Sequence, residues 1–277
     1  MNGGESGIRT DFIVNDQVNG YPVRTVETTA SRDELDDLVR AGYLVVRGLI
    51  APDAAATLAE GVLRLATAEA GQPGSEYLAD QSIYIRGLLD KDPVFHPLVR
   101  LEPALSVARS LLGPQVWIDL EARLNYPGSP GVCVPWHGHL PVIPDPQPAW
   151  FCYPHQVHCL VYLDRITEAE GALCLLPGSH ADLGVQIPLG DGSPKDGEVR
   201  LFFEPGDAVL IHGNLWHRTV PSQQHAGYRR LLLLGYVPAW IRNDIGDHGV
   251  KAAHPLKADL ALAGDGELRE LLGEFRW

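Results

Sequence analysis

The chain has 277 residues, of which 45% are hydrophobic and 21% charged, and its formal net charge at pH 7 is −13. This acidic balance argues against nucleic acid and anionic membranes as partners. Because the chain has no run of about 18 apolar residues and no basic start followed by an apolar stretch, we expect a cytoplasmic protein. We also expect it to be a monomer or a homodimer.

The first third of the chain predicts two helices around a short strand. Residues 1–30 are expected to form an irregular arm. Ser31 and Glu34 have the spacing of a capping box and begin an amphipathic helix that ends at Gly42. A strand over 43–49 follows, and Pro52 then opens a second helix that extends to about residue 70.

The rest of the chain changes from helical to strand-like patterns. A helix over 103–112 is stopped by a Gly-Pro pair, and another is expected over 267–275. Between them, short β-branched and aromatic runs alternate with Gly and Pro turns: 116–126, 132–139, 156–163, 171–176, 198–203, 207–212, 216–220 and 230–237. Such a series predicts an all-β sandwich or barrel.

The four cysteines do not indicate a disulfide framework or a zinc ribbon. They have irregular spacings and form no C-x-x-C pair: Cys133, Cys152, Cys159 and Cys174. We therefore expect reduced and mostly buried thiols.

Histidine placement is the strongest functional signal. His137 and His139 lie two apart in a strand-like run, so both side chains point to one face of the sheet, while Trp136 and Gly138 point to the other. A later strand supplies His217, and imidazoles that converge on one face suit a metal ion. An isolated H-x-H pattern is also compatible with a turn cap beside a surface residue.

Two arginines begin the apolar strand near residue 230. An arginine that enters a buried strand needs an anionic partner, and the candidates are Arg229 and Arg230. A bound dicarboxylate would supply the negative charge, and so would one of the 35 acidic residues in a structural ion pair.

The order of motifs resembles the phytanoyl-CoA dioxygenase family over about residues 33–240. The resemblance rests on the G-Y-L-V-V-R-G-L-I strand, the L-L-G-P turn, the W-H pair, the P-G-S-H segment and the G-D-A-V-L-I-H-x-x-x-x-H strand. The segment R-L-N-Y, residues 123–126, further resembles the R-I-N-Y of ectoine hydroxylases. The family implies Fe(II), 2-oxoglutarate and O₂ as cofactors on a double-stranded β-helix, a cupin-like jelly roll.

This resemblance implies a division of the chain and a mainly β fold with flanking helices. We expect a single oxygenase-type domain over 1–277. After the arm it would have a mostly helical flank over 31–115, a jelly-roll core over 116–240 and a C-terminal extension over 241–277.

The resemblance also assigns roles by position. His137 would be the first iron ligand and His217 the distal one, and Arg229 would bind the far carboxylate of 2-oxoglutarate through a bidentate guanidinium. Thr219 matches a hydroxyl that assists the arginine, and Asn125 matches a residue near the keto-acid end.

Four further residues have supporting places in this scheme. Arg123 is assigned to the co-substrate site, with Arg230 as the fallback anchor for the carboxylate. His212 is expected to support the metal ligands indirectly, and His180, in the P-G-S-H turn, to be structural.

The chain departs from the family in its metal motif, because the H-x-D of the family is H-x-H here, with His139 at the aspartate position. Imidazole in place of carboxylate raises the charge of the loaded centre by one unit and makes it less able to push electrons to O₂. Three outcomes are open: His139 binds the metal, or Asp145 or Glu121 replaces it, or the site has lost iron chemistry. Halogenation is not expected, because an imidazole would fill the position that a halide needs.

We therefore expect a 2-oxoglutarate-dependent oxygenase that acts on an unactivated C–H bond of a small molecule in specialised metabolism. Hydroxylation is the default outcome, and desaturation, epimerisation or cyclisation would begin in the same way. The alternatives are a non-catalytic jelly-roll binding protein and a three-histidine dioxygenase independent of 2-oxoglutarate. The site entrance is expected near several aromatic residues and an arginine: Tyr84, Arg86, Trp150, Phe151 and Tyr153.

Overall fold

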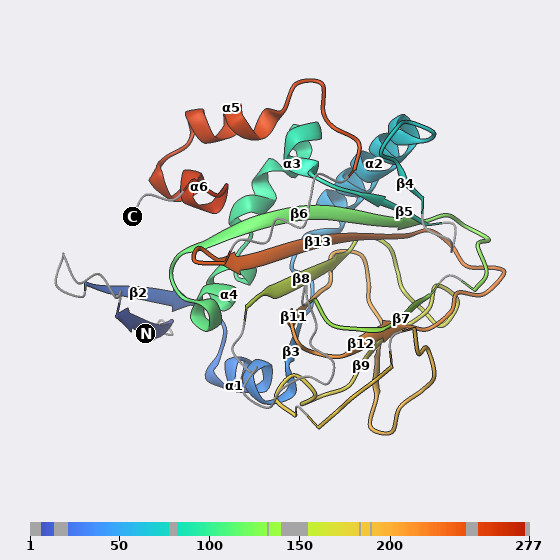
Figure 1. Cartoon of the computed structure of the whole chain (residues 1–277), viewed down its shortest axis with the longest axis horizontal. Helices are drawn as coiled ribbons and strands as arrows, with labels where there is room; N and C mark the ends of the chain where they lie inside the picture. Colours follow the sequence, from blue (N-terminus) through green and yellow to red (C-terminus); the bar gives the residue numbers. More distant parts are fainter. Residues whose placement is uncertain are drawn as a thin grey trace, which may run out of the picture.

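Two β-sheets face each other in the computed structural model of the chain (Figure 1), and helices cover the outer side of the larger sheet. The structure describes residues 7–13, 22–77, 82–131, 133–139, 155–182, 184–188, 190–241 and 249–274. Among these residues, no helix combines the length and the apolar character needed to span a membrane.

The larger sheet, called the major sheet below, has seven strands in the order β3-β11-β8-β13-β6-β5-β4. In that order the strands are Tyr43–Val46, Ala208–His212, Val157–Tyr162, Arg229–Pro238, Val116–Asn125, Ser82–Ile85 and Glu76–Tyr77. All neighbouring strands are antiparallel. The pattern agrees with the predicted jelly roll.

The minor sheet has four antiparallel strands in the order β10-β9-β12-β7. These strands are Val199–Leu201, Leu173–Leu175, His217–Thr219 and Val134–His137. A buried apolar cluster joins the two sheets, with Leu173 and Leu175 from the minor sheet against Leu160 and Leu231 from the major sheet. The two inner faces therefore pack on each other, and the sheets do not close into a barrel.

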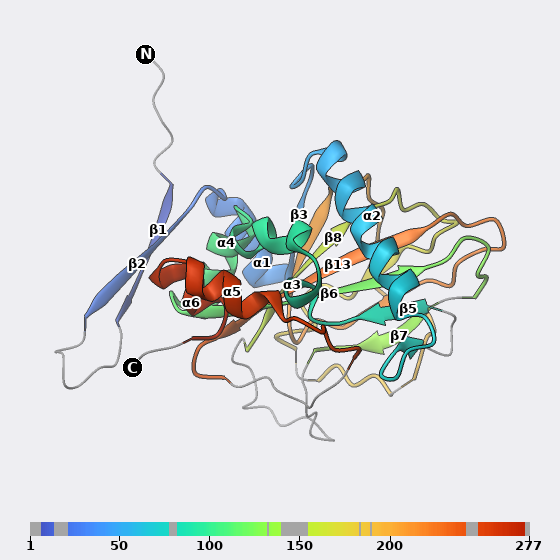
Figure 2. The same cartoon turned by 90° about the horizontal axis from the view of Figure 1, so that it is seen from above.

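Helices pack on the outer face of the major sheet, where the largest apolar cluster lies (Figure 2). The helical segments are α1 (Arg32–Ala41), α2 (Pro52–Glu69), α3 (Leu88–Lys91), η1 (Pro93–Arg100), α4 (Ala104–Leu112), α5 (Leu256–Ala263) and α6 (Gly266–Leu271). The predicted capping box is present in α1, which ends at Gly42 with φ at 85°, a left-handed conformation that favours glycine.

Strand β6 separates the two sides of the major sheet by strict alternation. Its even-numbered residues from 118 to 124 are aliphatic and at most 1% exposed, and they belong to the helix-side cluster. Its odd-numbered residues face the other way: Arg123 lies opposite Leu231, which is part of the cluster between the sheets. From residue 119 onward the inner row of β6 is therefore polar, with Asp119, Glu121, Arg123 and Asn125.

The expectation of an irregular arm over residues 1–30 is wrong for its described part. Strands β1 (Ile8–Ile13) and β2 (Val23–Thr28) pair in antiparallel register. Their β-branched residues and the alternate burial of Val26 and Thr28 are ordinary strand signals.

The expected boundary of the β core at residue 116 is also wrong. Strands β3, β4 and β5 precede it in the chain and join the major sheet. The helices α3, η1 and α5 were not predicted, because short segments give weak periodicity.

Three cysteines lie in the described chain as free thiols, with Cys159 and Cys174 buried and Cys133 half-buried. Burial raises the pKa of the Cys159 thiol, which keeps it protonated. Cys152 lies outside the described residues.

Candidate metal centre

Three histidines from two paired segments converge between the sheets. His137 ends β7 and His217 begins β12, and the two are directly opposite in the strand register. Their ring centroids are 4.1 Å apart, and the ring of His139 lies 4.6 Å from that of His217. One ring nitrogen from each histidine lies within 4.8 Å of the others, a spacing that could hold a metal ion.

Two of these histidines have their tautomer set by their own strand. The distance between Nδ1 of His137 and the carbonyl oxygen of Pro135 is 2.9 Å, and the same distance joins His217 to Leu215. A carbonyl oxygen only accepts hydrogen bonds, so Nδ1 is the protonated nitrogen in both rings. The Nε2 lone pairs of both rings are therefore left for a metal ion.

Burial keeps the three imidazoles neutral at neutral pH. It lowers the pKa of His137, with a smaller contribution from the charge of Arg123. The pKa values of His139 and His217 lie well below the usual range, again through burial first and the neighbouring imidazoles second. Neutral imidazole is the form that binds metal ions.

A fourth histidine, His158 on β8, contacts the group and was not singled out from the sequence. Its ring centroid lies 3.9 Å from that of His139, and both of its ring nitrogens are buried without a hydrogen-bond partner. Burial lowers the pKa of His158 to about 3. The available signal was its even-numbered position in the strand-like run 156–163, but alternation alone does not say which face is the inner one.

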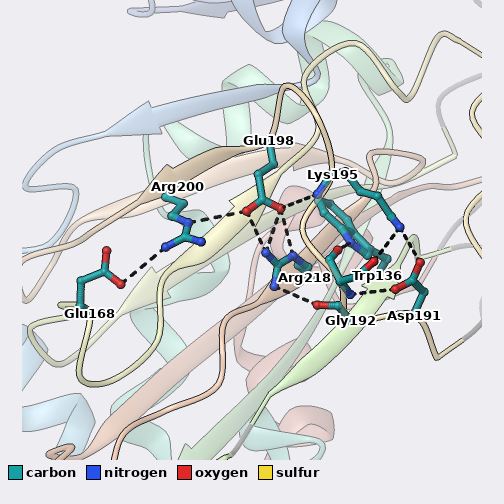
Figure 3. Close-up of polar contacts among 9 residues, drawn as sticks. Trp136, Glu168, Asp191, Gly192, Lys195, Glu198, Arg200 and Arg218 are labelled. Atoms are coloured by element: carbon teal, nitrogen blue, oxygen red, sulfur yellow. Dashed lines mark hydrogen bonds and ion pairs between the residues drawn. The ribbon is translucent and has the colours of Figure 1, made fainter.

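The back of the two ligand strands is held by a buried ion-pair network (Figure 3). Arg218, next to His217 in the chain, is 2% exposed, and both oxygens of Glu198 accept hydrogen bonds from its Nη2 at 2.8 Å. Its guanidinium carbon lies 5.3 Å from the ring centroid of Trp136, the neighbour of His137. Trp136 in turn donates from its indole nitrogen to the carbonyl oxygen of Ser193 at 2.7 Å. This network fixes β7 and β12 behind the metal ligands.

A buried arginine without an acidic partner lies beyond Thr219 on the same side. Arg229 is 5% exposed, and its Nη2 donates to the hydroxyl of Thr219 over 3.3 Å. Its Nε has no hydrogen-bond partner, and no carboxylate of the described chain pairs with it. A buried cation without a counter-ion is unfavourable, so this environment fits an anionic ligand.

Asn125 strengthens the fit because it lies opposite Arg229 in the register of β6 and β13. It is 4% exposed, and both polar atoms of its side-chain amide are buried without a partner. Unpaired buried amide groups are costly in a folded protein unless a ligand completes them. The pair Arg229 and Asn125 therefore suits a carboxylate with neighbouring polar groups.

The expectation that Arg230 could serve as the fallback anchor is wrong. Arg230 alternates to the other side of β13 and pairs with Asp164, with Nη2 at 2.5 Å from Oδ1 and Nε at 2.9 Å from Oδ2. Its charge is compensated within the chain. Arg229 therefore remains the candidate for the carboxylate anchor.

Glu121, one of the two carboxylates considered as replacements for His139, is not in the histidine group of the described chain. Glu121 accepts hydrogen bonds from the hydroxyl of Tyr84 and from Nη1 of Arg86, the latter at 2.7 Å. Burial, followed by the nearby Asp119, raises the pKa of Glu121 to about 7. Asp145 lies outside the described residues, together with Trp150, Phe151 and Tyr153.

His212 and His180 form a separate contact with ring centroids 4.8 Å apart. Nδ1 of His212 accepts a hydrogen bond from the backbone N–H of Asn214 at 3.1 Å. Nε2 of His180 lies 2.9 Å from the carbonyl oxygen of Val39, so it donates there. Both histidines therefore lie outside the group of three.

Comparison with known proteins identifies the family. The family model for phytanoyl-CoA dioxygenase (PhyH) matches residues 38–230. The ectoine dioxygenase of Bordetella parapertussis is 29% identical over 160 residues, 54% of this chain and 49% of that protein. The ectoine dioxygenase of Nocardia farcinica is 25% identical over 201 residues, 65% of each chain. This chain thus matches about half of the length of the Bordetella relative.

Solved structures share the fold at lower identity. HygX from Streptomyces hygroscopicus, with nickel and 2-oxoglutarate bound, has a TM-score of 0.60 and 20% identity over 83% of this chain and 98% of its own. The 2-oxoglutarate-dependent epimerase SnoN has a TM-score of 0.57 and 18% identity over 81% of this chain and 91% of its own. Together with the matching family model, the histidine and arginine placement shows that this chain belongs to the phytanoyl-CoA dioxygenase family of Fe(II)- and 2-oxoglutarate-dependent oxygenases.

Proposed function

We propose that the protein is an Fe(II)- and 2-oxoglutarate-dependent oxygenase that acts on an unactivated C–H bond of a small molecule. The observation that carries this proposal is the combination of three converging neutral histidines with a buried arginine that has no acidic partner among the described residues. A structural role would require the chain to pair Arg229 itself. Hydroxylation is the default outcome, and desaturation, epimerisation or cyclisation would begin at the same centre.

The residues divide into a metal set and a co-substrate set. His137, His139 and His217 would hold the iron through ring nitrogens. Iron bound there, together with 2-oxoglutarate, would activate O₂ for oxidation of the substrate. Arg229 would bind the far carboxylate of 2-oxoglutarate, with the hydroxyl of Thr219 fixing the guanidinium.

Two further side chains assist the co-substrate. The amide of Asn125 would donate to a 2-oxoglutarate oxygen and so satisfy its buried N–H groups. Arg123 lies two residues away on the same inner row of β6 and adds positive charge beside His137. Leu231 and Leu160 of the inter-sheet cluster exclude water from this region.

His139 gives the centre an unusual charge. Three neutral imidazoles bring no negative charge to Fe(II), whereas two imidazoles with one carboxylate bring one unit. The geometry of the group favours His139 as the third ligand over Glu121, which is held by Tyr84 and Arg86. We expect a centre with weaker electron donation to O₂ than one that carries the family's aspartate.

Anaerobic titration tests the whole assignment. Protein given Fe(II) should bind one equivalent, and 2-oxoglutarate added next should produce a visible charge-transfer band. Arg229→Ala should bind the metal normally and lose the band at the same co-substrate concentration. Absence of both the band and measurable 2-oxoglutarate binding in the wild type would reject the proposal.

Variants of His139 test the ligand set. If the imidazole of His139 binds the metal, His139→Ala should weaken metal affinity by at least the roughly 10-fold to 100-fold that loss of a group supporting a ligand costs. His139→Asp restores the family motif and should keep metal binding while it increases co-substrate turnover. An unchanged metal affinity in His139→Ala would instead indicate that another group completes the site.

A three-histidine dioxygenase that needs no 2-oxoglutarate is the second candidate, favoured by the all-imidazole group itself. It predicts substrate-dependent O₂ consumption that neither 2-oxoglutarate nor Arg229→Ala changes. The buried guanidinium of Arg229 without an anion counts against it.

A further inference from the structure

A second group of unpaired polar side chains lies around Gly235 on the inner face of the major sheet. In the strand register, Gly235 lies between Asp119 on β6 and His158 on β8. A Cβ atom at Gly235 would be 3.0 Å from Nε2 of Gln156 and 3.5 Å from Cε1 of His158. These two side chains therefore extend over a position that has no side chain of its own. We call Asp119, Gln156, His158 and Gly235 the Gly235 patch.

The polar side chains of the Gly235 patch lack partners within the described chain. Gln156 is only 5% exposed, yet its side-chain amide makes no hydrogen bond to a described residue. Both ring nitrogens of His158 are buried and unpaired. A buried imidazole with unused hydrogen-bonding capacity costs free energy, and with the unpaired amide of Gln156 beside it the patch points to a ligand that completes both groups.

The charge around the patch is negative. Arg86 pairs with both Glu76 and Glu121, with each closest N···O distance at 2.7 Å, and Glu121 also accepts from Tyr84. Asp119 forms no ion pair with a cation of the described chain. Burial raises the pKa of Asp119, and Lys257 and Arg86 offset this only from a distance. Asp119 is thus a half-buried carboxylate whose charge is not compensated by contact.

We propose that the Gly235 patch recognises a protonated amine on the substrate of the oxygenase. The ammonium group would donate hydrogen bonds to the carboxylate of Asp119 and to the amide oxygen of Gln156, and His158 would accept a further one. The identification of this ligand as the substrate rests on the proposed oxygenase function. A neutral polyol could use the same acceptors but would leave the charge of Asp119 uncompensated.

The patch lies in the right place for substrate. Gly235 and Arg229 are on the same inner row of β13, six residues apart, or roughly 20 Å along the strand. His158 of the patch contacts His139 of the metal group. Substrate and 2-oxoglutarate would therefore approach the histidines from opposite ends, with the amine over Gly235, roughly one strand spacing of about 5 Å from β6 on one side and from β8 on the other.

A pair of matched probes tests the charge preference. Protein loaded with Ni(II), which does not support turnover, and 2-oxoglutarate would be titrated calorimetrically with 1,5-diaminopentane and with 1,5-pentanediol. We expect the diamine to bind at least tenfold more tightly than the diol. Equal affinity of the wild type for the two probes would overturn the proposal.

Variants identify the residues that cause the preference for the diamine over the diol. Asp119→Asn should abolish the discrimination between the probes, and Gln156→Leu should weaken diamine binding by roughly threefold to tenfold. Asp36→Asn, at an exposed position on α1, is the matched control and should bind both probes like the wild type. Discrimination that survives in Asp119→Asn would also overturn the proposal.

The same samples separate this inference from the proposed function. An unchanged 2-oxoglutarate affinity in Asp119→Asn shows that the variant is folded. If it does not fold, the wild-type comparison and Gln156→Leu decide the question. If the wild type binds no 2-oxoglutarate, the proposed function fails, and the probe titration repeated on metal-free protein still tests the amine site.

Discussion

The two faces of strand β6 differ sharply in polarity. On the helix side the residues are Ile118, Leu120, Ala122 and Leu124, each at most 1% exposed. On the inner side, at the alternating positions, are Asp119, Glu121, Arg123 and Asn125. A strand that is covered on both faces, here by helices and by the minor sheet, would be apolar on both if its role were only structural. The difference shows that the outer face stabilises the fold, and it is consistent with the proposed ligand-binding role of the inner face.

The comparison predicts its largest effect on the outer face. Leu120→Ala should lower the free energy of unfolding by about 2–5 kcal/mol, because it removes buried contacts and leaves a void. Urea denaturation measures this loss. The folded fraction should bind 2-oxoglutarate with wild-type affinity, and a parallel loss of affinity would mean that the two faces are not separable.

On the inner face, Arg229→Ala should have the opposite profile. Its 2-oxoglutarate affinity should fall by at least about 100-fold, because the carboxylate loses its buried cation. Its free energy of unfolding should stay equal or rise, since the described part of the chain supplies no anion to Arg229. Titration and urea denaturation of one preparation measure both quantities. A large loss of stability would assign Arg229 to the fold instead.

The outer face of the major sheet is not wholly apolar, because His212 follows Ala208 and Leu210 on that side of β11. We expect this buried histidine to lower the stability of the fold at acidic pH. Burial, then His180 and His155, lower the pKa of His212 to about 3, below its unfolded value of 6.5. Between these values the unfolded state binds more protons, so stability falls as the pH decreases below 6.5.

For this one group the loss between pH 7 and pH 5 is roughly 2 kcal/mol. Urea denaturation of the metal-free protein at both pH values measures it. His212→Asn should reduce the pH dependence by that amount. The same pH dependence in the variant and in the wild type would show that other groups dominate.

The smallest effect is expected where a ligand group is replaced by an apolar one of similar size. Asn125→Leu should raise the free energy of unfolding by up to about 1 kcal/mol, because two unpaired buried polar atoms are removed. The affinity for 2-oxoglutarate should decrease by roughly tenfold. Thermal unfolding and titration check the pair of changes, and a destabilised variant would imply that Asn125 has a partner in the fold.

Much of the fold and of the metal site could be predicted from the sequence because both follow local patterns. The capping box of α1 and the strand alternation that sends His137 inward and Trp136 outward need no tertiary information. The convergence of His217 with His137 depends on strand pairing, which the family resemblance supplied. The same resemblance points to Arg229 as the carboxylate anchor, and that assignment stays a prediction.

The remainder could not be predicted because it depends on register between distant strands. His158 and Asp119 become neighbours only through their common pairing partner Gly235. No spacing within a single segment encodes that relation. Arg230 could not be excluded as an anchor from the sequence, because its partner Asp164 lies 66 residues away in the chain.

The candidate metal ligands His137 and His217 share a local arrangement that could be used in other proteins. Each histidine directly follows a tryptophan in the chain, and each donates a hydrogen bond to the carbonyl two residues before it. The tautomer is thus chosen within a tripeptide, and only the cross-strand register brings the two rings together. This tripeptide could be transferred to other proteins. Placed at opposite positions of a designed antiparallel strand pair, two copies should provide two pre-oriented Nε2 ligands, to which a third ligand can be added.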